Sequence, residues 1–239
     1  MKIITVASAK GGVGKSTFCQ GVGKMLSLGG ERVLLVDMDI GVRSLDILLG
    51  VAEKTVYNWG DVIKGNCEYR KAVIEAAKNL FLIPAPIDFS DAYTAEAFKD
   101  MIDLLKKDFD YILLDAPAGL EIGFKLASVA ADCCVIVTTP DNVSIRAATY
   151  AAQNMRESGV KNIRLVVNKF NKKFHKNIDV DSFVDTVGAR FLGVIPDSTD
   201  VYVSSNGGDI PYNSKGNQAF LRISKRLSGE NVPFRVKNL

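Results

Sequence analysis

The sequence predicts an α/β fold in which a doubly wound, mostly parallel sheet is flanked by helices on both sides. Three observations support this prediction. Short runs of β-branched and aliphatic residues alternate with longer amphipathic segments along the 239-residue chain. The short runs are nearly continuously apolar, which is typical of parallel strands buried on both faces. Several of them end on Asp, Asn or glycine-rich turns, where a ligand site is expected in such a sheet.

Seven segments have the character of buried strands: 2–8, 32–37, 79–85, 109–117, 133–139, 163–168 and 191–196. Between them lie segments of helical length, including 16–28, 92–107, 143–158 and 215–228. No Pro/Gly/Ser-rich linker interrupts this pattern, so we expect residues 1–239 to form a single domain, with 229–239 as a short C-terminal tail. The lysine-rich stretch 168–177, which contains His175, is expected to be a surface loop.

The composition disfavours several classes of function. With 47% hydrophobic and 24% charged residues the chain resembles a packed soluble protein, and a net charge of +3 does not by itself indicate a nucleic-acid-binding protein. No stretch reaches the ~18 uninterrupted apolar residues of a membrane span, and the first residues do not resemble a signal peptide. The four cysteines lack CxxC spacing, so a reducing cytoplasm is expected, and Cys133 and Cys134 are predicted to be buried structural residues rather than metal or redox groups.

Residues 7–17, "ASAKGGVGKST", form a glycine-rich loop between the first predicted strand and the first predicted helix. Gly14, Lys15 and Ser16 match the end of a phosphate-binding loop, whereas Ala9 stands where the strict pattern has its first glycine. Backbone N–H groups and the positive end of the helix would converge there on phosphate oxygens. Lys15 is expected to bind the β- and γ-phosphates, and the Ser16 hydroxyl to join a Mg²⁺ shell. A connector without a ligand is the disfavoured alternative.

The stretch "KGGVGKS" also contains a second lysine, Lys10, which an ordinary phosphate loop does not need. It resembles the deviant Walker A motif of the MinD/ParA family of P-loop ATPases, whose hallmark is a lysine at this position. The resemblance implies that Lys10 reaches across an ATP-dependent homodimer to phosphate bound by the partner subunit, somewhat as an arginine finger does. The predicted nucleotide contacts of the loop are Lys10, Gly11, Gly12, Val13, Gly14, Lys15, Ser16 and Thr17.

Further segments are similar to the MinD branch of this family, so the resemblance covers essentially the whole chain. Segment 34–50 resembles switch I, 115–124 resembles Walker B with switch II, and 227–236 resembles the end of the core. The implied activity is a slow, partner-stimulated hydrolysis of ATP to ADP and phosphate by a dimerising switch. Its implied role is septum-site placement or a related positioning task in a bacterial cell.

The resemblance assigns roles residue by residue. Asp39 matches the switch I aspartate that orients the attacking water, Asp115 matches the Walker B aspartate, and Asp37 is expected to support Mg²⁺ or Lys15. The predicted catalytic residues are thus Lys10, Lys15 and Asp39, and the predicted metal residues are Ser16, Asp37 and Asp115. Turn formation or helix capping is the alternative for Asp37 and Asp39.

Other matching positions concern adenine and partner proteins. Asn168 and the Pro196-Asp197 turn match the adenine-framing positions, with ordinary strand-end turn chemistry as the alternative. An activator or effector is expected at switch I and switch II, with Arg43 and Asp46 as partner contacts. Ser44 stands where MinD proteins commonly have asparagine.

Three alternatives concern what the protein binds besides ATP. The basic amphipathic segment 217–227 could contact a membrane, but a closing helix packed on the sheet is favoured, and no clear C-terminal anchor is expected. A ParA-like DNA-partition ATPase or a flagellar-number regulator would use the same loop, although DNA binding is not favoured. A metallochaperone ATPase ranks last because segment 115–124 contains no cysteine. The expected location is cytoplasmic, with peripheral contact at the inner face of the cell membrane as an alternative.

Overall fold

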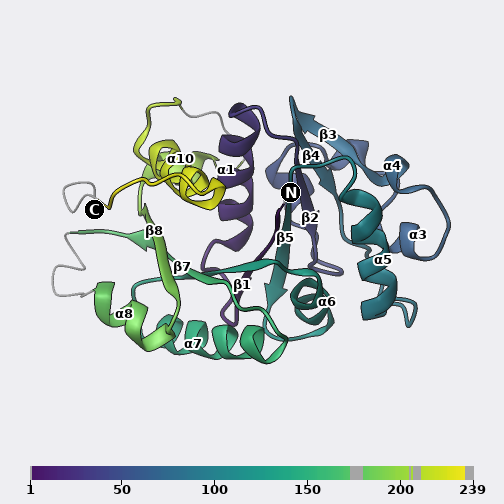
Figure 1. Cartoon of the computed structure of the whole chain (residues 1–239). Coiled ribbons are helices and arrows are strands. Elements are labelled where there is room, and N and C mark those ends of the chain that lie inside the picture. Colours follow the sequence, from purple (N-terminus) through teal and green to yellow (C-terminus); the bar gives the residue numbers. More distant parts are fainter. Residues whose placement is uncertain (1, 173–179, 205, 207–210, 235–239) are drawn as a thin grey trace.

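An eight-stranded sheet with the strand order β3-β4-β2-β5-β1-β6-β7-β8 runs through the centre of the molecule (Figure 1). All neighbouring strands are parallel except β3, which pairs antiparallel with β4. The predicted doubly wound, mostly parallel sheet is therefore confirmed. The structure is a computed structural model that describes residues 2–172, 180–204, 206 and 211–234. His175, most of the predicted loop and the end of the predicted tail lie outside these residues.

The strands are β1 (Lys2–Ser8), β2 (Val33–Asp37), β3 (Ile74–Ala77), β4 (Leu80–Ile83), β5 (Tyr111–Ala118), β6 (Cys133–Thr138), β7 (Ile163–Phe170) and β8 (Arg190–Pro196). The helices are α1 (Lys15–Leu28), α2 (Leu45–Leu48), α3 (Trp59–Ile63), α4 (Tyr69–Ala72), α5 (Ala95–Leu105), α6 (Ile122–Ala130), α7 (Asn142–Glu157), α8 (Val180–Val187), α9 (Thr199–Ser204) and α10 (Lys215–Ser228), with a 3-10 turn at Ala52–Lys54. No helix among the described residues is both long and apolar enough to cross a bilayer.

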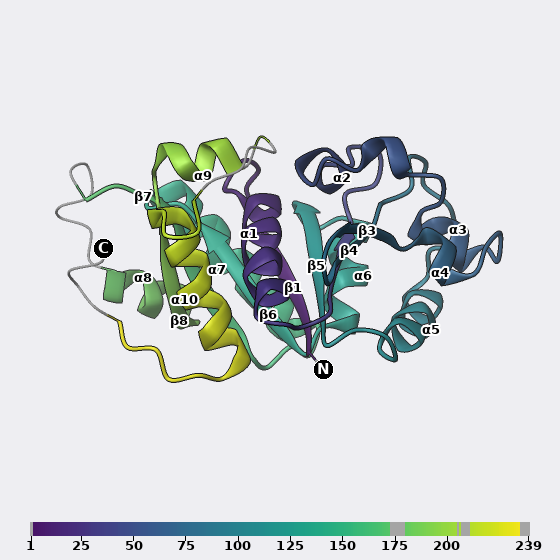
Figure 2. The same cartoon turned by 90° about the horizontal axis from the view of Figure 1, so that it is seen from above.

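Helices cover both faces of the sheet and create two hydrophobic cores. α1 and α10 lie on one face, and α5, α6, α7 and α8 lie on the other (Figures 1 and 2). β1, β5 and β6 supply residues to both cores because their successive side chains point to opposite faces. This two-sided burial explains why their sequences are continuously apolar.

All seven predicted strands form, with ends that shift by up to two residues. The eighth strand, β3, was not predicted because its four residues are too few to carry a hydrophobic pattern, and only Ile74 is buried. The predicted helix 92–107 is shorter in the structure. It begins at Ala95 because the hydroxyl of Thr94 accepts a hydrogen bond from the backbone N–H of Ala97 and caps the helix.

The amphipathic segment 217–227 lies within α10, and its apolar side chains Phe220, Ile223 and Leu227 are buried against α1 and β8. The packing is close. A Cβ atom added to Gly21 of α1 would lie 2.6 Å from the Phe220 ring. The prediction of a closing helix is therefore confirmed, and this apolar face is not available to a membrane. Cys133 and Cys134 are likewise buried, as predicted.

The packing of α10 on α1 gives a stability prediction. Phe220→Ala should lower the free energy of unfolding by about 3–5 kcal/mol, because it removes a buried ring and leaves a cavity. Urea denaturation measures this difference. The control is Leu28→Ala at the end of α1, where the side chain is 61% exposed, and it should change stability by less than about 0.5 kcal/mol. Equal effects of the two substitutions would contradict the packing described.

Candidate functional site

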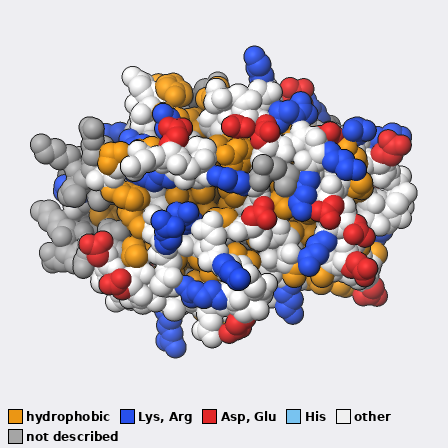
Figure 3. All heavy atoms as spheres, viewed as in Figure 1, with side chains coloured by type: hydrophobic (Ala, Val, Ile, Leu, Met, Phe, Trp, Pro, Cys, Tyr) orange, Lys and Arg blue, Asp and Glu red, His pale blue; other side chains and the backbone are white. Residues whose placement is uncertain are grey.

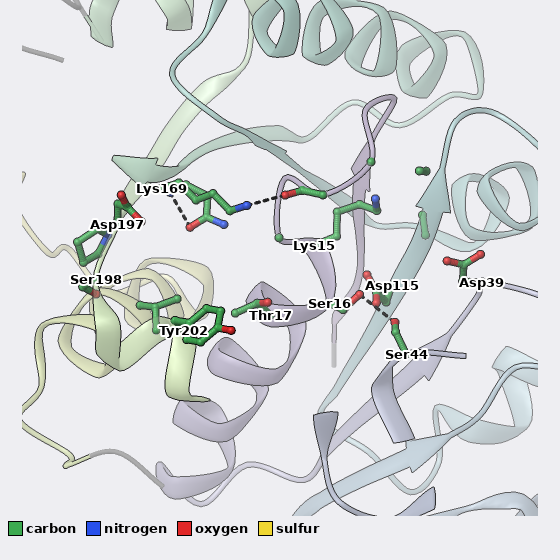
Figure 4. A pocket seen from close by; sticks show the side chains of 18 residues that line it. Lys15, Ser16, Thr17, Asp39, Ser44, Asp115, Lys169, Asp197, Ser198 and Tyr202 are labelled. Carbon is green, nitrogen blue, oxygen red and sulfur yellow. Dashed lines mark hydrogen bonds between the residues drawn. The ribbon is translucent and has the colours of Figure 1, made fainter. Parts of the chain in front are cut away.

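The ends of β1, β2, β5, β7 and β8 surround a cavity of about 580 Å³ at the carboxyl edge of the sheet (Figure 4). Ligands of open α/β sheets bind at this edge. The cavity is lined by Gly11, Gly12, Gly14, Lys15, Ser16, Thr17, Asp39, Ser44, Asp115, Ala116, Ala118, Asn168, Lys169, Pro196, Asp197, Ser198, Val201 and Tyr202. Most of the predicted site residues are therefore brought together. Lys10, Val13 and Asp37 are not among the lining residues.

The loop between β1 and α1 has the geometry of an anion-binding loop. Gly12 and Gly14 have φ values of 72° and 97°, a left-handed conformation that favours glycine. The helix begins directly after Gly14, and no side chain caps its first N–H groups. Those groups, together with the ammonium of Lys15, leave a concentration of positive charge at the cavity. The loop therefore has the conformation expected of a phosphate site, and phosphate binding remains a prediction.

The end of β7 holds this loop in place. The side-chain amide of Asn168 donates to the carbonyl of Val13 at 2.7 Å, and the ammonium of Lys169 donates to the carbonyl of Gly12 at 2.8 Å. A Cβ on Gly14 would come within 2.2 Å of the Asn168 amide nitrogen, so only glycine allows this contact. Sequence reasoning missed Lys169, whose only signal is its place beside Asn168 at the end of a strand.

The far end of the cavity is formed by the turn after β8 and by α9. Asp197, Ser198 and Tyr202 lie there, separated from Asp39 and Asp115 by the start of α1 (Figure 4). Pro196 also lines the cavity. The backbone N–H of Asp197 donates to Phe170 at 2.9 Å and fixes the turn against β7. The ring of Tyr202 is 70% exposed and was not predicted from the sequence.

Asp37 is a buried carboxylate that holds the switch I segment (34–50). Its Oδ1 accepts from the backbone N–H of Asp39 at 2.9 Å, and its Oδ2 accepts from Ser44 at 2.9 Å and Leu45 at 3.0 Å. Burial raises the pKa of Asp37 above its ordinary value, and the three N–H donors oppose this rise. Both oxygens thus position a loop, and the predicted role of Asp37 at the metal remains a prediction.

Asp115 lies beside Asp37 because the two residues are in register on the adjacent strands β5 and β2. It is 2% exposed, and its Oδ1 has no hydrogen-bond partner among the described residues. Burial and the charge of Asp37 raise the pKa of Asp115 to about 7, although Ser16, Lys15 and Cys19 oppose the rise. A buried carboxylate oxygen without a partner is suited to a cation or to the water shell of one.

The donor set fits Mg²⁺ bound together with phosphate. Within the described ranges no three His, Cys, Asp or Glu residues gather into a metal-binding group. Protein ligands would come from Ser16 and the region of Asp115, and the remaining positions would be filled by phosphate oxygens and water, as is usual for Mg²⁺. Asp39 faces the same space, half-buried, and burial raises its pKa while Lys15 opposes that rise.

Lys10 points away from the cavity of its own chain. Its ammonium donates to the hydroxyl of Ser144 at 2.7 Å and to the carboxylate of Asp141 at 3.3 Å, at the start of α7. Burial works against ionisation of Asp141, but hydrogen bonds from Ser144, Thr139 and Lys10 lower its pKa below the ordinary value. The lysine is 39% exposed along its side chain, so it lies at the surface next to the loop.

The two predicted partner contacts in switch I, Arg43 and Asp46, lie next to each other in the structure. Arg43 and Asp46 form an ion pair with each other, and the Asp46 side chain is only 5% exposed. The Asp46 side chain is therefore turned into the molecule, and its contact with a partner remains a prediction. The exposed side chains of this segment are Val42 and Ile47, at 68% and 70%.

A cavity at the switch point of a parallel sheet, walled by a glycine-rich loop that opens a helix, places the chain in the class of P-loop nucleotide-binding proteins. Residues 1–180 match a family described as an AAA domain. Known relatives narrow the class further, and the chain belongs to the MinD-like branch of the MinD/ParA family of P-loop ATPases.

Three of the similar proteins define this placement. The septum site-determining protein MinD of Bacillus subtilis is 36% identical, with 98% of this chain and 91% of the relative covered. A MinC:MinD cell division protein complex of Aquifex aeolicus contains a chain with 33% identity and a TM-score of 0.90, covering 98% of each chain. MinD of Pyrococcus horikoshii complexed with Mg-ADP is 26% identical, with a TM-score of 0.84 and 95% of each chain covered.

The raised pKa of Asp115 predicts a pH dependence of stability in the ligand-free protein. Because the folded state holds this proton more tightly than the unfolded chain, the stabilisation is fully present below about pH 4 and is lost as the pH rises to about 7. Asp115→Asn should remove this decline, which by the pKa difference amounts to roughly 4 kcal/mol at most. Urea unfolding between pH 4 and 8 measures it.

The matched control is Asp103→Asn, at a side chain that is 64% exposed on α5. It should keep the wild-type pH profile. Parallel profiles of the wild type and Asp115→Asn would contradict the assignment of a proton to buried Asp115.

Proposed function

We propose that this protein binds ATP and Mg²⁺ in the cavity at the end of β1 and hydrolyses the ATP slowly. It acts as a MinD-type dimerisation switch, and its role is septum-site placement or a related positioning task in a bacterial cell. The observation that carries this proposal is the division of labour between two lysines in one loop. Lys15 lies inside the cavity, whereas Lys10 lies outside it at the surface.

The residues of the cavity suit the three parts of a nucleoside triphosphate. The N–H groups at the start of α1 and the Lys15 ammonium bind the phosphates, and Tyr202 with the Pro196-Asp197 turn lies where the base would be held. When bound, Mg²⁺ neutralises charge on the phosphates. Ser16 and Asp115 are the residues that would hold it, directly or through water.

Hydrolysis needs a positioned water more than a strong base. Asp39 follows β2 directly, and its backbone is fixed by the carboxylate of Asp37. Its own carboxylate lines the cavity close to Lys15, so it can accept a hydrogen bond from a water aimed at the γ-phosphate. The lysines that line the cavity are Lys15 and Lys169, and the ammonium of Lys169 is already bonded to the carbonyl of Gly12. A slow rate is therefore expected until a further cation stabilises the transition state from the open side.

A second subunit would supply that cation through Lys10. The ammonium is held by the buried Ser144 hydroxyl and by the carboxylate of Asp141, and the ion pair with Asp141 is exchangeable because both of its side chains are partly exposed. Closing two copies face to face over two triphosphates would transfer Lys10 from its own α7 to the phosphate of the partner. The single domain expected from the sequence is compatible with such a symmetric dimer.

An effector is also part of the proposal, because a relative is known in a MinC:MinD complex. The exposed apolar side chains Val42 and Ile47 of the switch I segment are suited to contact an effector. Such contacts would depend on the nucleotide if the conformation of this segment does.

The DNA-partition alternative gains no support from the face seen in Figure 3, where Lys and Arg are interspersed with Asp and Glu. Peripheral membrane contact would require a surface other than the apolar face of α10.

The two lysines give a direct test. Lys15→Ala should weaken ATP binding at least about tenfold, because it removes charge-assisted hydrogen bonds to phosphate. Lys10→Ala should keep ATP affinity within about twofold, but lose ATP-induced dimerisation and at least about tenfold in hydrolysis rate, as loss of an arginine-finger-like cation does. Calorimetry, light scattering with a non-hydrolysable ATP analogue, and phosphate release measure these effects.

The control is Lys99→Ala, an exposed lysine on α5, which should leave all three measurements unchanged. Equal rates of hydrolysis in the wild type and Lys10→Ala would overturn the role of Lys10 across the dimer. Failure of the wild type to bind ATP would overturn the proposed function itself.

A further inference from the structure

Ser44 has a side-chain orientation that its position in a helix does not explain. It is the N-cap residue of α2, where serine usually accepts a hydrogen bond from its own helix, yet its hydroxyl makes no such bond. Its Oγ lies instead 3.1 Å from the Oγ of Ser16 in the phosphate loop, and both residues line the cavity (Figure 4). Two hydroxyls from segments 28 residues apart thus meet beside the phosphate site.

The backbone of Ser44 is held in place by hydrogen bonds. Its backbone N–H and that of Leu45 donate to one oxygen of buried Asp37, and its carbonyl accepts from Leu48 at 3.1 Å. The backbone of Asp37 in turn accepts from the indole N–H of Trp59 at 2.8 Å. The hydroxyl of Ser44 can therefore turn about one side-chain bond while its backbone stays in place.

The spacing of the two hydroxyl oxygens matches neighbouring ligands of one magnesium ion. An octahedral Mg²⁺ with ligands at about 2.1 Å places adjacent ligand oxygens about 3.0 Å apart. Ser16 Oγ and Ser44 Oγ lie 3.1 Å apart. The buried Asp115 also lines this cavity, and its Oδ1 has no partner among the described residues. Two hydroxyls and a nearby carboxylate form a set of hard oxygen donors for such an ion.

We propose that Ser44 is a second protein ligand of the magnesium ion, beside Ser16, so that the ion links the phosphate loop to the switch I segment. This inference rests on the proposed binding of Mg²⁺ and nucleotide. The ion replaces the Ser16–Ser44 hydrogen bond with two Mg–O bonds at nearly the same oxygen spacing. Binding of the ion therefore adds a link between the phosphate loop and the start of α2 without a large movement, and its loss leaves that end of the switch I segment held by Asp37.

The test counts the waters bound to the ion. Mn²⁺ takes the place of Mg²⁺ in a complex with ADP, and broadening of its EPR signal in ¹⁷O-enriched water gives the number of coordinated waters. Ser44→Ala should show one more water than the wild type, and its half-saturating Mn²⁺ concentration should rise about 10- to 100-fold, as loss of a metal-site residue does. Ser44→Thr keeps the hydroxyl and should match the wild type.

The single tryptophan gives a second readout. Trp59 is fully buried and bonded to the backbone of Asp37, so its fluorescence responds to the packing beneath the switch I segment. Adding Mg²⁺ to the ADP complex should change this fluorescence in the wild type and Ser44→Thr, and much less in Ser44→Ala. The control Ser158→Ala, at an exposed position after α7, should behave as the wild type.

The outcomes separate this inference from the proposed function. An unchanged water count and an unchanged fluorescence response in Ser44→Ala, with Mn²⁺ and ADP bound, would overturn the role of Ser44 and leave the proposed function standing. Failure of the wild type to bind Mn²⁺ and ADP together would overturn both. Ser44→Ala keeps the backbone N–H that Asp37 accepts, and circular dichroism checks that it folds.

Discussion

Two buried carboxylates, Asp37 at the end of β2 and Asp115 within β5, lie side by side on neighbouring strands. The arrangement of the site depends on how each carboxylate is hydrogen-bonded or paired. A buried charge is unstable unless it is paired or hydrogen-bonded. Asp37 is satisfied by three backbone N–H groups, and this fixes the switch I segment against the end of β2. Asp115 keeps one oxygen without a partner among the described residues, and its pKa is raised to about 7. Asp37 therefore holds the switch I segment in place, whereas Asp115 offers a carboxylate oxygen that a cation could bind.

The phosphate loop is held by the opposite half of the sheet. Asn168 and Lys169 bond two of its carbonyl groups, which keeps the carbonyls turned away and the N–H groups available for an anion. Lys10 is held separately, by the start of α7. The loop thus lies between two groups of side chains. The carboxylates of β2 and β5 lie on one side of it, and the polar groups of β7 and α7 lie on the other. A cation would pair with the carboxylate oxygen that has no partner among the described residues, and a triphosphate would accept hydrogen bonds from the N–H groups of the loop.

The fold could be predicted from the sequence because buried parallel strands must be apolar along their whole length, and the seven runs that satisfy this are strands in the structure. The phosphate loop could be predicted because its glycines and Lys-Ser pair follow each other in the chain. Residues that reach the site from elsewhere carry no such local signal. Lys169 and Tyr202 have ordinary surroundings in the sequence, and only the tertiary arrangement brings them to the cavity. Burial of Asp46 likewise depends on its pairing with Arg43 in a strained loop, where Arg43 has a φ of 52°.

The central claim is that Asp115 carries a proton in the absence of a cation and gives it up when the cation binds. Calorimetric titration of Mg²⁺ into the ADP complex at pH 7, in buffers of different ionisation enthalpy, counts the released protons. Because burial raises the pKa of Asp115, the wild type should release more protons than Asp115→Asn at this pH. Equal proton release by the two proteins, each with Mg²⁺ bound, would contradict the account.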